Sequence, residues 1–534
     1  MSMRFSFGTR QIDDSDEDMG SDSEINVKLS AAGAKSCPSD IGNCRTLDRS
    51  SPYWNDIDEA YSIIEGKNYF IPYFALILCL GGHLTSITGF IPFLVKTPDL
   101  LCSYNDGKSW SKWDRDEACS NSHSLMYKVD QNSMETVLNW NTLFDLTCSS
   151  KLTLGLFGSF IFIGCAIGSI TILRFGDIYG RKPVVNITNI ISIFVLIGLY
   201  FAHNIILVYF LLLLVGALHL TKGTLLYIHY LEFIPNSQML KYHSLACVIQ
   251  ISFGFVGIVF FMLVTDGLRY MFVVTAISII HSFWIFAWPE SPRFLYSKRK
   301  FEEVHKALAF IARINRAQPW HQKFAIESDE HSDVDSDAAP TINMVDAFKD
   351  NTYRSNLIIM AINWVVWSLS FHVIGYYIGE FPGSTFVNAS IIVLADVLSC
   401  SLIKPYVNLI GVKHGFSAAY ACVIVIILLY TFTKKNVVID YFCVFSMRFG
   451  INMAFSLSYY GNSEIFDVKL KSRSYAIWMF WAKVFTIASP LMVELMPHPI
   501  LAIIGLTFVA GILSQFIRKG NSFRDPEGLK DKIQ

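Results

Sequence analysis

Six ionisable residues lie inside long apolar stretches of this sequence: Lys222, His372, Asp396, Lys404, Arg448 and Lys483. A charged side chain near the centre of a bilayer costs at least about 2.5 to 3.5 kcal/mol, so each of them needs an ion-pair partner or a function. The cations at 222, 448 and 483 outnumber the carboxylate of Asp396, and this excess of positive charge favours an anionic ligand. The alternatives are an ion pair between Asp396 and a lysine, and lysine side chains that reach the polar membrane interface.

Aromatic residues surround one of these positions. The stretch NWVVWSLSFHVIGYY contains Trp367, Phe371, His372 and Tyr376. Aromatic walls bury the apolar body of a ligand while a polar group fixes its orientation, so this stretch is a candidate binding surface. The alternative interpretation is ordinary helix packing. His372 can titrate near neutral pH and couple binding to protons, or it can be a hydrogen-bonded packing residue.

The apolar stretches are the elements that must position these side chains. Hydrophobic residues make up 52% of the 534 residues, charged residues make up 16%, and the mean hydropathy is +0.40, which is outside the range of soluble domains. A helix of about 20 apolar residues crosses a bilayer. Twelve stretches qualify: 69–95, 152–173, 184–202, 205–229, 245–264, 270–288, 356–378, 386–409, 415–433, 439–460, 474–495 and 499–517.

Hydrophilic segments divide these stretches into two sets of six. Residues 1–65 include DDSDEDMGSDSE and predict a disordered, acidic, cytoplasmic tail. Residues 289–355 predict a cytoplasmic linker between a first half, 66–288, and a second half, 356–517, and residues 518–534 form a second cytoplasmic tail. Lysine and arginine cluster in the loops that this topology places inside, in agreement with the positive-inside rule.

The segment 96–151 lies outside in this topology. It contains Cys102, Cys119 and Cys148. An oxidising compartment allows one disulfide among these three residues and leaves one thiol over, but their spacing does not indicate which two are joined. The alternative is three free thiols.

Two charged motifs recur at similar points of the two halves. Glu232 lies in YLEFIP after the fourth stretch, and Glu464 lies in NSEIFD after the tenth, followed by Lys471 and Arg473. A carboxylate at equivalent positions suggests an internal duplication, the architecture in which a binding site forms between the repeats near the membrane midplane.

Three further motifs carry a resemblance to a known family. The loop RFGDIYGRKPVV, with Asp177, Arg181 and Lys182, resembles the signature loop of the major facilitator superfamily. PESPR, with Glu290 and Arg293, is the form found in its sugar and organic ion transporters. The segment NWNTLFDLTC resembles the signature of the organic cation, anion and zwitterion transporter family. The resemblance covers residues 66–517, although the second-half loop is reduced to NLIGVKHG.

The resemblance implies a major facilitator fold and a role for particular residues. Lys483 follows Glu464 by nineteen residues, at the position where cation carriers of this family have Asp and anion carriers have Arg. The expected substrate-binding residues are Lys483, Arg448, Phe371, His372, Trp367, Tyr376, Asp396 and Lys222. The expected gating residues are Asp177, Arg181, Lys182, Glu232, Glu290, Arg293, Glu464, Lys471 and Arg473.

We therefore predict an all-α integral membrane protein with twelve transmembrane helices that moves small organic ions, in particular organic anions, by alternating access. The alternative is a transporter-like protein that acts as a receptor, sensor or subunit of a membrane assembly. No HExxH, paired CxxC or GxSxG motif occurs, so we expect no enzyme, cofactor or metal. The expected partners are the organic ion, a coupling ion of unspecified identity and membrane lipid, without nucleic acid. The family resides by default in the plasma membrane, but the outer segment has no N-x-S/T sequon, which leaves an internal membrane open.

Overall fold

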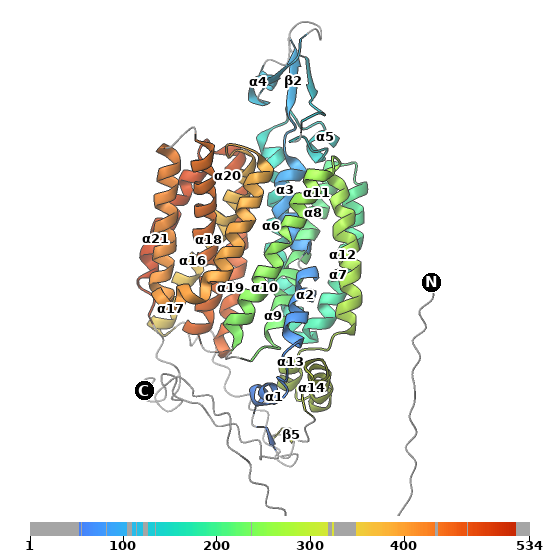
Figure 1. The fold of residues 1–534 in the computed structure, drawn as a ribbon, viewed down its shortest axis with the longest axis vertical. Helices are drawn as coiled ribbons and strands as arrows, with labels where there is room; N and C mark the ends of the chain where they lie inside the picture. The colour runs from blue at the N-terminus through green and yellow to red at the C-terminus, as the bar shows by residue number, and fades with distance from the viewer. Residues whose placement is uncertain are drawn as a thin grey trace, which may run out of the picture. The chain divides into compact units, whose positions relative to one another are not determined.

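The computed structural model contains a bundle of long helices within one compact unit, Ser51–Gln534. It describes residues 53–54, 56–81, 83–103, 109–113, 115–120, 126–133, 135–235, 238–318, 323–324, 349–432, 436–466 and 468–518. The acidic motif of the first tail, the acidic part of the linker and the second tail beyond residue 518 lie outside the described residues. In Figure 1 the helices up to α12 lie on one side of the bundle and those from α16 onward lie on the other.

The helices of the two halves follow the chain in order. The first half contains α2 Phe70–Gly81, α3 His83–Val95, α6 Lys151–Tyr179, α7 Arg181–Phe201, α8 Ile205–Leu220, α9 Leu226–Leu231, α10 Met239–Ser252, α11 Gly254–Leu263 and α12 Tyr270–Ala287. The second half contains α16 Asn351–Tyr376, α17 Thr385–Phe432, α18 Val437–Ile465, α19 Val468–Thr486, α20 Ala488–Leu495 and α21 Pro499–Ser514. Helix α6 packs against α19 and α20, and α10 packs against α17, so the two halves meet along these helices.

The predicted apolar stretches correspond to these helices. Each of the twelve coincides with a described helix, a part of one, or two or three consecutive helical elements, so the prediction of a helical bundle is confirmed. In the described part of the chain, nine helical segments are long and apolar enough to cross a membrane by length and composition, and α21 is a shorter apolar helix. The number of twelve crossings stays a prediction.

Two glycines end helices at corresponding points of the two halves. Gly180 separates α6 from α7 with φ 104°, and Gly411 interrupts α17 with φ 76°. Residues with a Cβ rarely adopt these positive φ values, so glycine allows the chain to reverse here. At Gly180 an added Cβ would also meet the carboxylate of Glu290, whereas Gly411 lies in open space. The reduced second-half loop therefore keeps its glycine turn.

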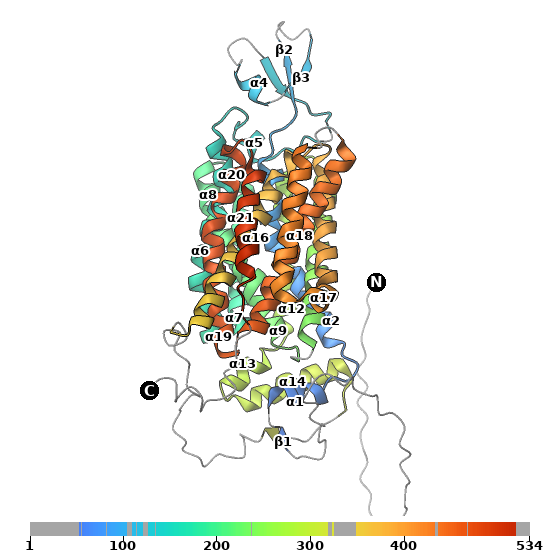
Figure 2. The same cartoon turned by 90° about the vertical axis from the view of Figure 1, so that its left-hand side faces the viewer.

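A small sheet stands at one end of the bundle, which we call the sheet end. It contains β2 Leu100–Ser103 between β3 Ser111–Trp113 and β4 Met126–Val129, all antiparallel. The short helix α4 Arg115–Ser120 lies between β3 and β4 in the chain, and α5 Trp140–Leu143 follows β4. Figures 1 and 2 both show it on the side opposite to α13 Pro292–Ser297 and α14 Phe301–Asn315.

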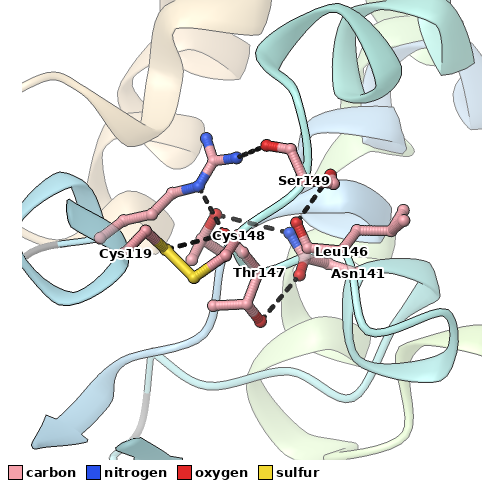
Figure 3. The surroundings of a disulfide bond; sticks show 8 residues. Cys119, Asn141, Leu146, Thr147, Cys148 and Ser149 are labelled. Atoms are coloured by element: carbon pink, nitrogen blue, oxygen red, sulfur yellow. Dashed lines mark hydrogen bonds between the residues drawn. A yellow bond between two sulfur atoms is a disulfide. The ribbon is translucent and has the colours of Figure 1, made fainter. Parts of the chain in front are cut away.

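A disulfide joins this outer segment to the start of α6. Cys119 of α4 is bonded to Cys148 (Figure 3). Cys102 of β2 is buried and free. Beside the bond, Arg115 donates to the backbone carbonyl of Thr147 at 2.7 Å and to that of Ser149 at 2.9 Å. The covalent bond and these hydrogen bonds hold α4 against the segment that enters the bundle.

The opposite end of the bundle is more ordered than the sequence predicts. The prediction of a disordered tail over residues 1–65 is wrong for α1 Ile57–Ile63, whose N-cap residue Asp56 accepts a hydrogen bond from the Glu59 N–H at 2.8 Å. The linker also begins with α13 and α14. The strand β1 Tyr53–Trp54 pairs with β5 Lys323–Phe324, and Trp54 is fully buried against Phe324. Few apolar residues are enough to order this segment, because they pack on the linker helices.

Candidate functional site

A cavity of about 360 Å³ lies between the two halves. Its wall comes from α3, α8, α9, α10 and α11 of the first half and from α16, α17, α18 and α19 of the second. The volume is within the range of small-molecule sites, which is about 300 to 1,000 Å³. Seven of the eight predicted substrate-binding residues line it: Trp367, Phe371, His372, Tyr376, Asp396, Arg448 and Lys483. The structure does not describe the side chain of Lys222, the eighth.

Arg448 and Asp396 form a buried ion pair in the cavity wall. The Arg448 Nε lies 2.8 Å from Oδ1 of Asp396, and its Nη2 lies 2.9 Å from Oδ2, while both side chains are only 6% exposed. Nη1 donates to the backbone carbonyl of Phe371 at 2.6 Å, and the guanidinium carbon lies 3.2 Å from the centre of the Phe371 ring. Arg448 is therefore neutralised by a two-point pair and is held in place. The predicted excess of three cations over one carboxylate counted a charge that Asp396 already compensates.

Lys483 differs from Arg448 in its electrostatic surroundings. Its side chain is buried, at 7% exposure, and it lines the cavity from α19. Among the described side chains no carboxylate pairs with it; its neighbours are the Phe162 ring, 5.9 Å from Nζ, together with Cys165, His219 and His372. An unpaired ammonium in such a place costs several kcal/mol. Lys404, by contrast, is exposed and does not line the cavity.

Aromatic rings cover the second-half side of the cavity. Trp367 lies edge-on to Phe371 at 6.3 Å and to Phe455 at 4.7 Å. The indole Nε1 of Trp367 and the hydroxyl of Tyr376 are buried without a hydrogen-bond partner among the described residues. The ring of His372 is held by its Nδ1–H, which donates to the carbonyl of Ser368 at 2.6 Å. These two polar donors thus have no hydrogen-bond partner among the described residues.

The first half contributes residues that were not predicted. Thr88, His219, Tyr227 and His243 line the cavity, and Tyr459 of the second half stacks on His243 at 5.8 Å. The sequence feature that could have identified these residues is a polar residue at an isolated position of an apolar helix. No spacing rule distinguishes such a residue from one that packs between helices, because the answer depends on the helix that faces it.

The predicted gating residues of the first half form one network at the end of the bundle that carries α13. Arg181 lies 2.9 Å from Glu232 and 3.2 Å from Asp177. The backbone N–H of Lys182 donates to Glu290 at 3.1 Å, and Gly176 accepts from Arg181 at 3.1 Å. Burial raises the pKa of the Glu232 carboxyl and outweighs the opposing effect of Arg181.

Arg293 extends this network to α1. It donates to the carboxylate of Asp58 at 2.6 Å and to the backbone carbonyls of Glu232 and Ile234 at 3.2 and 3.0 Å. Asp58 was missed because its segment was predicted to be disordered. The structure does not describe the side chains of the second-half gating residues, Glu464, Lys471 and Arg473.

At the sheet end a second network joins the halves directly. Lys96 lies 2.6 Å from Glu135 and donates to the Thr385 hydroxyl at 2.8 Å, and the Ser384 hydroxyl donates to Glu135 at 2.6 Å. Partial burial raises the pKa of Glu135, but the hydrogen bonds from Lys96 and Ser384 outweigh it and leave the pKa below its ordinary value. Nearby, the rings of Phe93 and Phe386 stack at 5.6 Å.

Comparison with known sequences gives a family match and distant relatives. Residues 111–518 match the family described as sugar (and other) transporter. Solute carrier family 22 member 21 of Mus musculus is 21% identical over 401 residues, covering 74% of this chain and 71% of the relative. Organic cation/carnitine transporter 2 of Homo sapiens is 22% identical over 404 residues, with the same coverage.

Comparison of the fold points to the same architecture. The partially occluded, inward-open form of the xylose transporter XylE from E. coli aligns with a TM-score of 0.57 and 15% sequence identity. The alignment covers 86% of this chain and 99% of that structure. At this identity the likeness shows the fold alone.

Proposed function

Because this chain belongs to the sugar (and other) transporter family of the major facilitator superfamily, we propose that it carries small organic ions, organic anions in particular, across a membrane by alternating access. The observation that carries the proposal is the buried Lys483 in the cavity between the halves, with which no carboxylate pairs among the described side chains. An anionic substrate relieves the cost of this buried charge, whereas a cationic substrate adds to it.

The state of Arg448 supports the same substrate class. Its charge is compensated by Asp396, so the pair presents no net charge to a ligand. Lys483 then determines the sign of the net charge on the described cavity wall. The unsatisfied donors of Trp367 and Tyr376 can bond oxygen atoms of a substrate, and the aromatic rings accept a flat apolar body.

The named relatives include an organic cation/carnitine transporter. Their names support organic ions as the general class, and the choice of anions rests on Lys483 in this chain. Lys483 stands where cation carriers of the resembled family have Asp and anion carriers have Arg, which supports the same choice. The membrane is proposed to be the plasma membrane, the family default.

Transport, as opposed to reception alone, is supported by the two charged networks at opposite ends of the bundle. Alternating access requires the halves to rock about a central site, with contacts that close one end at a time. The network of Lys96, Glu135 and Ser384 joins the halves at the sheet end. At the other end, Arg181, Glu232 and Glu290 form the charged network that the signature loop of the first half predicts.

Uptake into proteoliposomes tests the proposal. The panel contains benzoate and benzenesulfonate as anions, tetraethylammonium as a cation and carnitine as a zwitterion. We expect saturable anion uptake in the wild type and a loss of at least about tenfold in Lys483→Ala and Lys483→Asp, because each removes the buried cation. Lys404→Ala, which removes an exposed lysine outside the cavity, is the matched control and should behave as the wild type.

Two results would contradict the proposal. Uptake of the cation alone, unaffected by Lys483→Ala, would reverse the substrate class. No uptake of any panel member by folded, correctly inserted protein would favour the receptor or subunit interpretation instead.

A further inference from the structure

A histidine of the first half lies beside Lys483 in the cavity. His219, near the end of α8, lines the cavity and is close enough to interact electrostatically with Lys483 and with His372. These three groups come from α8, α16 and α19, so they cluster where the two halves face each other. Lys483 carries the proposed function, in which His219 has no role.

The hydrogen bond of the His219 ring determines what its free nitrogen can do. Nδ1 lies 3.2 Å from the hydroxyl of Thr88 on α3. When this hydroxyl donates to Nδ1, a neutral ring carries its proton on Nε2, and the ring can donate that proton to an anion. Thr88 therefore acts as the positioning residue for His219.

The local helix geometry is unusual at this point. The π-helix Thr221–Leu225, labelled η1 in the chain order, follows α8 directly, and its residues Gly223 and Thr224 also line the cavity. Single π turns within α-helices are rare and occur frequently at functional sites. His219 and Tyr227 are eight positions apart. In a regular α-helix this separation would place their side chains about a quarter of a turn apart around the helix axis. The wider turn reduces this rotation, and both residues line the cavity.

We propose that the anionic group of the substrate is held jointly by Lys483 of the second half and His219 of the first half. This inference rests on the proposed transport of organic anions and specifies how the anion is recognised. Two donors, one from each half, select a compact oxyanion with at least two oxygen atoms, such as a carboxylate or a sulfonate. A ligand held by both halves couples its own binding to their approach, since rocking of the halves changes the distance between the two donors.

Binding of benzenesulfonate and of its neutral analogue benzenesulfonamide to the purified full-length protein tests this inference by titration calorimetry. His219→Ala should weaken benzenesulfonate binding about tenfold, the effect of one hydrogen bond to a charged group. Thr88→Val should weaken it less, because the ring remains but loses its orientation. Benzenesulfonamide binding should change much less in either variant, because its sulfonyl oxygens are uncharged and accept a weaker hydrogen bond. His203→Ala, an exposed histidine between α7 and α8, is the matched control.

The outcomes separate the two proposals. If the wild type binds benzenesulfonate and Lys483→Ala weakens it, but His219→Ala binds it as the wild type does, the joint site is overturned and the proposed function stands. If the wild type does not bind benzenesulfonate, or if Lys483→Ala leaves that binding unchanged, both fail. His219→Asn, which keeps a polar side chain, serves as a second variant if His219→Ala does not fold.

Discussion

Arg448 on α18 and Asp396 on α17 neutralise each other in the cavity wall through a two-point ion pair with contacts of 2.8 and 2.9 Å. Such a pair is favourable only while both partners remain, because each charge is buried and has lost its water. It also fixes the carbonyl and ring of Phe371, with which the guanidinium is in contact. The pair is therefore expected to shape the cavity without contributing net charge to it.

Breaking this pair should destabilise the protein strongly. Asp396→Asn and Arg448→Gln should each cost about 3 to 5 kcal/mol, because each leaves an uncompensated buried charge. The double variant should recover much of this loss. Thermal unfolding midpoints in detergent check the prediction, with Glu302→Gln in the exposed pair with Lys306 as the control, which should change little. Additive losses in the double variant would show that the two charges do not depend on each other.

Charge reversal at Arg181 should slow transport without removing the binding site. Arg181→Glu places a carboxylate beside Glu232 and Asp177, so the network at the α13 end is disrupted while the cavity is untouched. We expect turnover to fall about tenfold or more with little change in substrate affinity, and Glu232→Arg in the same chain to restore part of it. Arg174→Glu, at an exposed position of the preceding helix α6, is the control. Wild-type turnover in well-expressed Arg181→Glu would remove this network from the transport cycle.

The sheet-end network predicts a dependence of stability on pH. The pKa of Glu135 in the folded protein lies below its ordinary value of about 4.3, so its stabilising effect is complete above that pH. The effect is lost as the pH falls below about 4.3 and through the lowered pKa, where the carboxylate becomes protonated. Because the pair with Lys96 is partly exposed, the effect should be modest. Unfolding midpoints of the wild type and Glu135→Gln should therefore converge in acid, and Glu303→Gln, at an exposed position of α14, should follow the wild type. Equal differences at all pH values would contradict the assignment.

Loss of the Cys119–Cys148 bond should destabilise the outer segment. The bond joins residues 29 apart in sequence, and closing a loop of this size stabilises a protein by about 3 to 4 kcal/mol in the chain-entropy model. Cys119→Ser together with Cys148→Ser should lower the unfolding midpoint, and a reducing agent should lower that of the wild type to the same value. Cys422→Ala, which removes an exposed free thiol, is the control. A wild-type midpoint that a reducing agent leaves unchanged would mean that the bond does not stabilise the fold.

The sequence alone determined the helical architecture and the family. Both depend on local information: the length of each apolar stretch sets where a helix forms in lipid, and motifs such as GDIYGRK and PESPR are contiguous. The match of residues 111–518 confirms the predicted superfamily. The positions of Lys483, Phe371 and Trp367 were also identified from the sequence, and all three line the cavity, although their roles stay predictions.

What only the tertiary structure decided is which side chains meet. Arg448 and Asp396 are separated by 52 residues, and the sequence could not show that they cancel each other, so its count of free cations was too high. His219 and Thr88 are 131 residues apart and become neighbours only when α8 packs against α3. In the same way α1 is ordered because the linker helices bury its apolar side. Electrostatic compensation and burial depend on distances in space, and these follow from packing between helices that are remote in sequence.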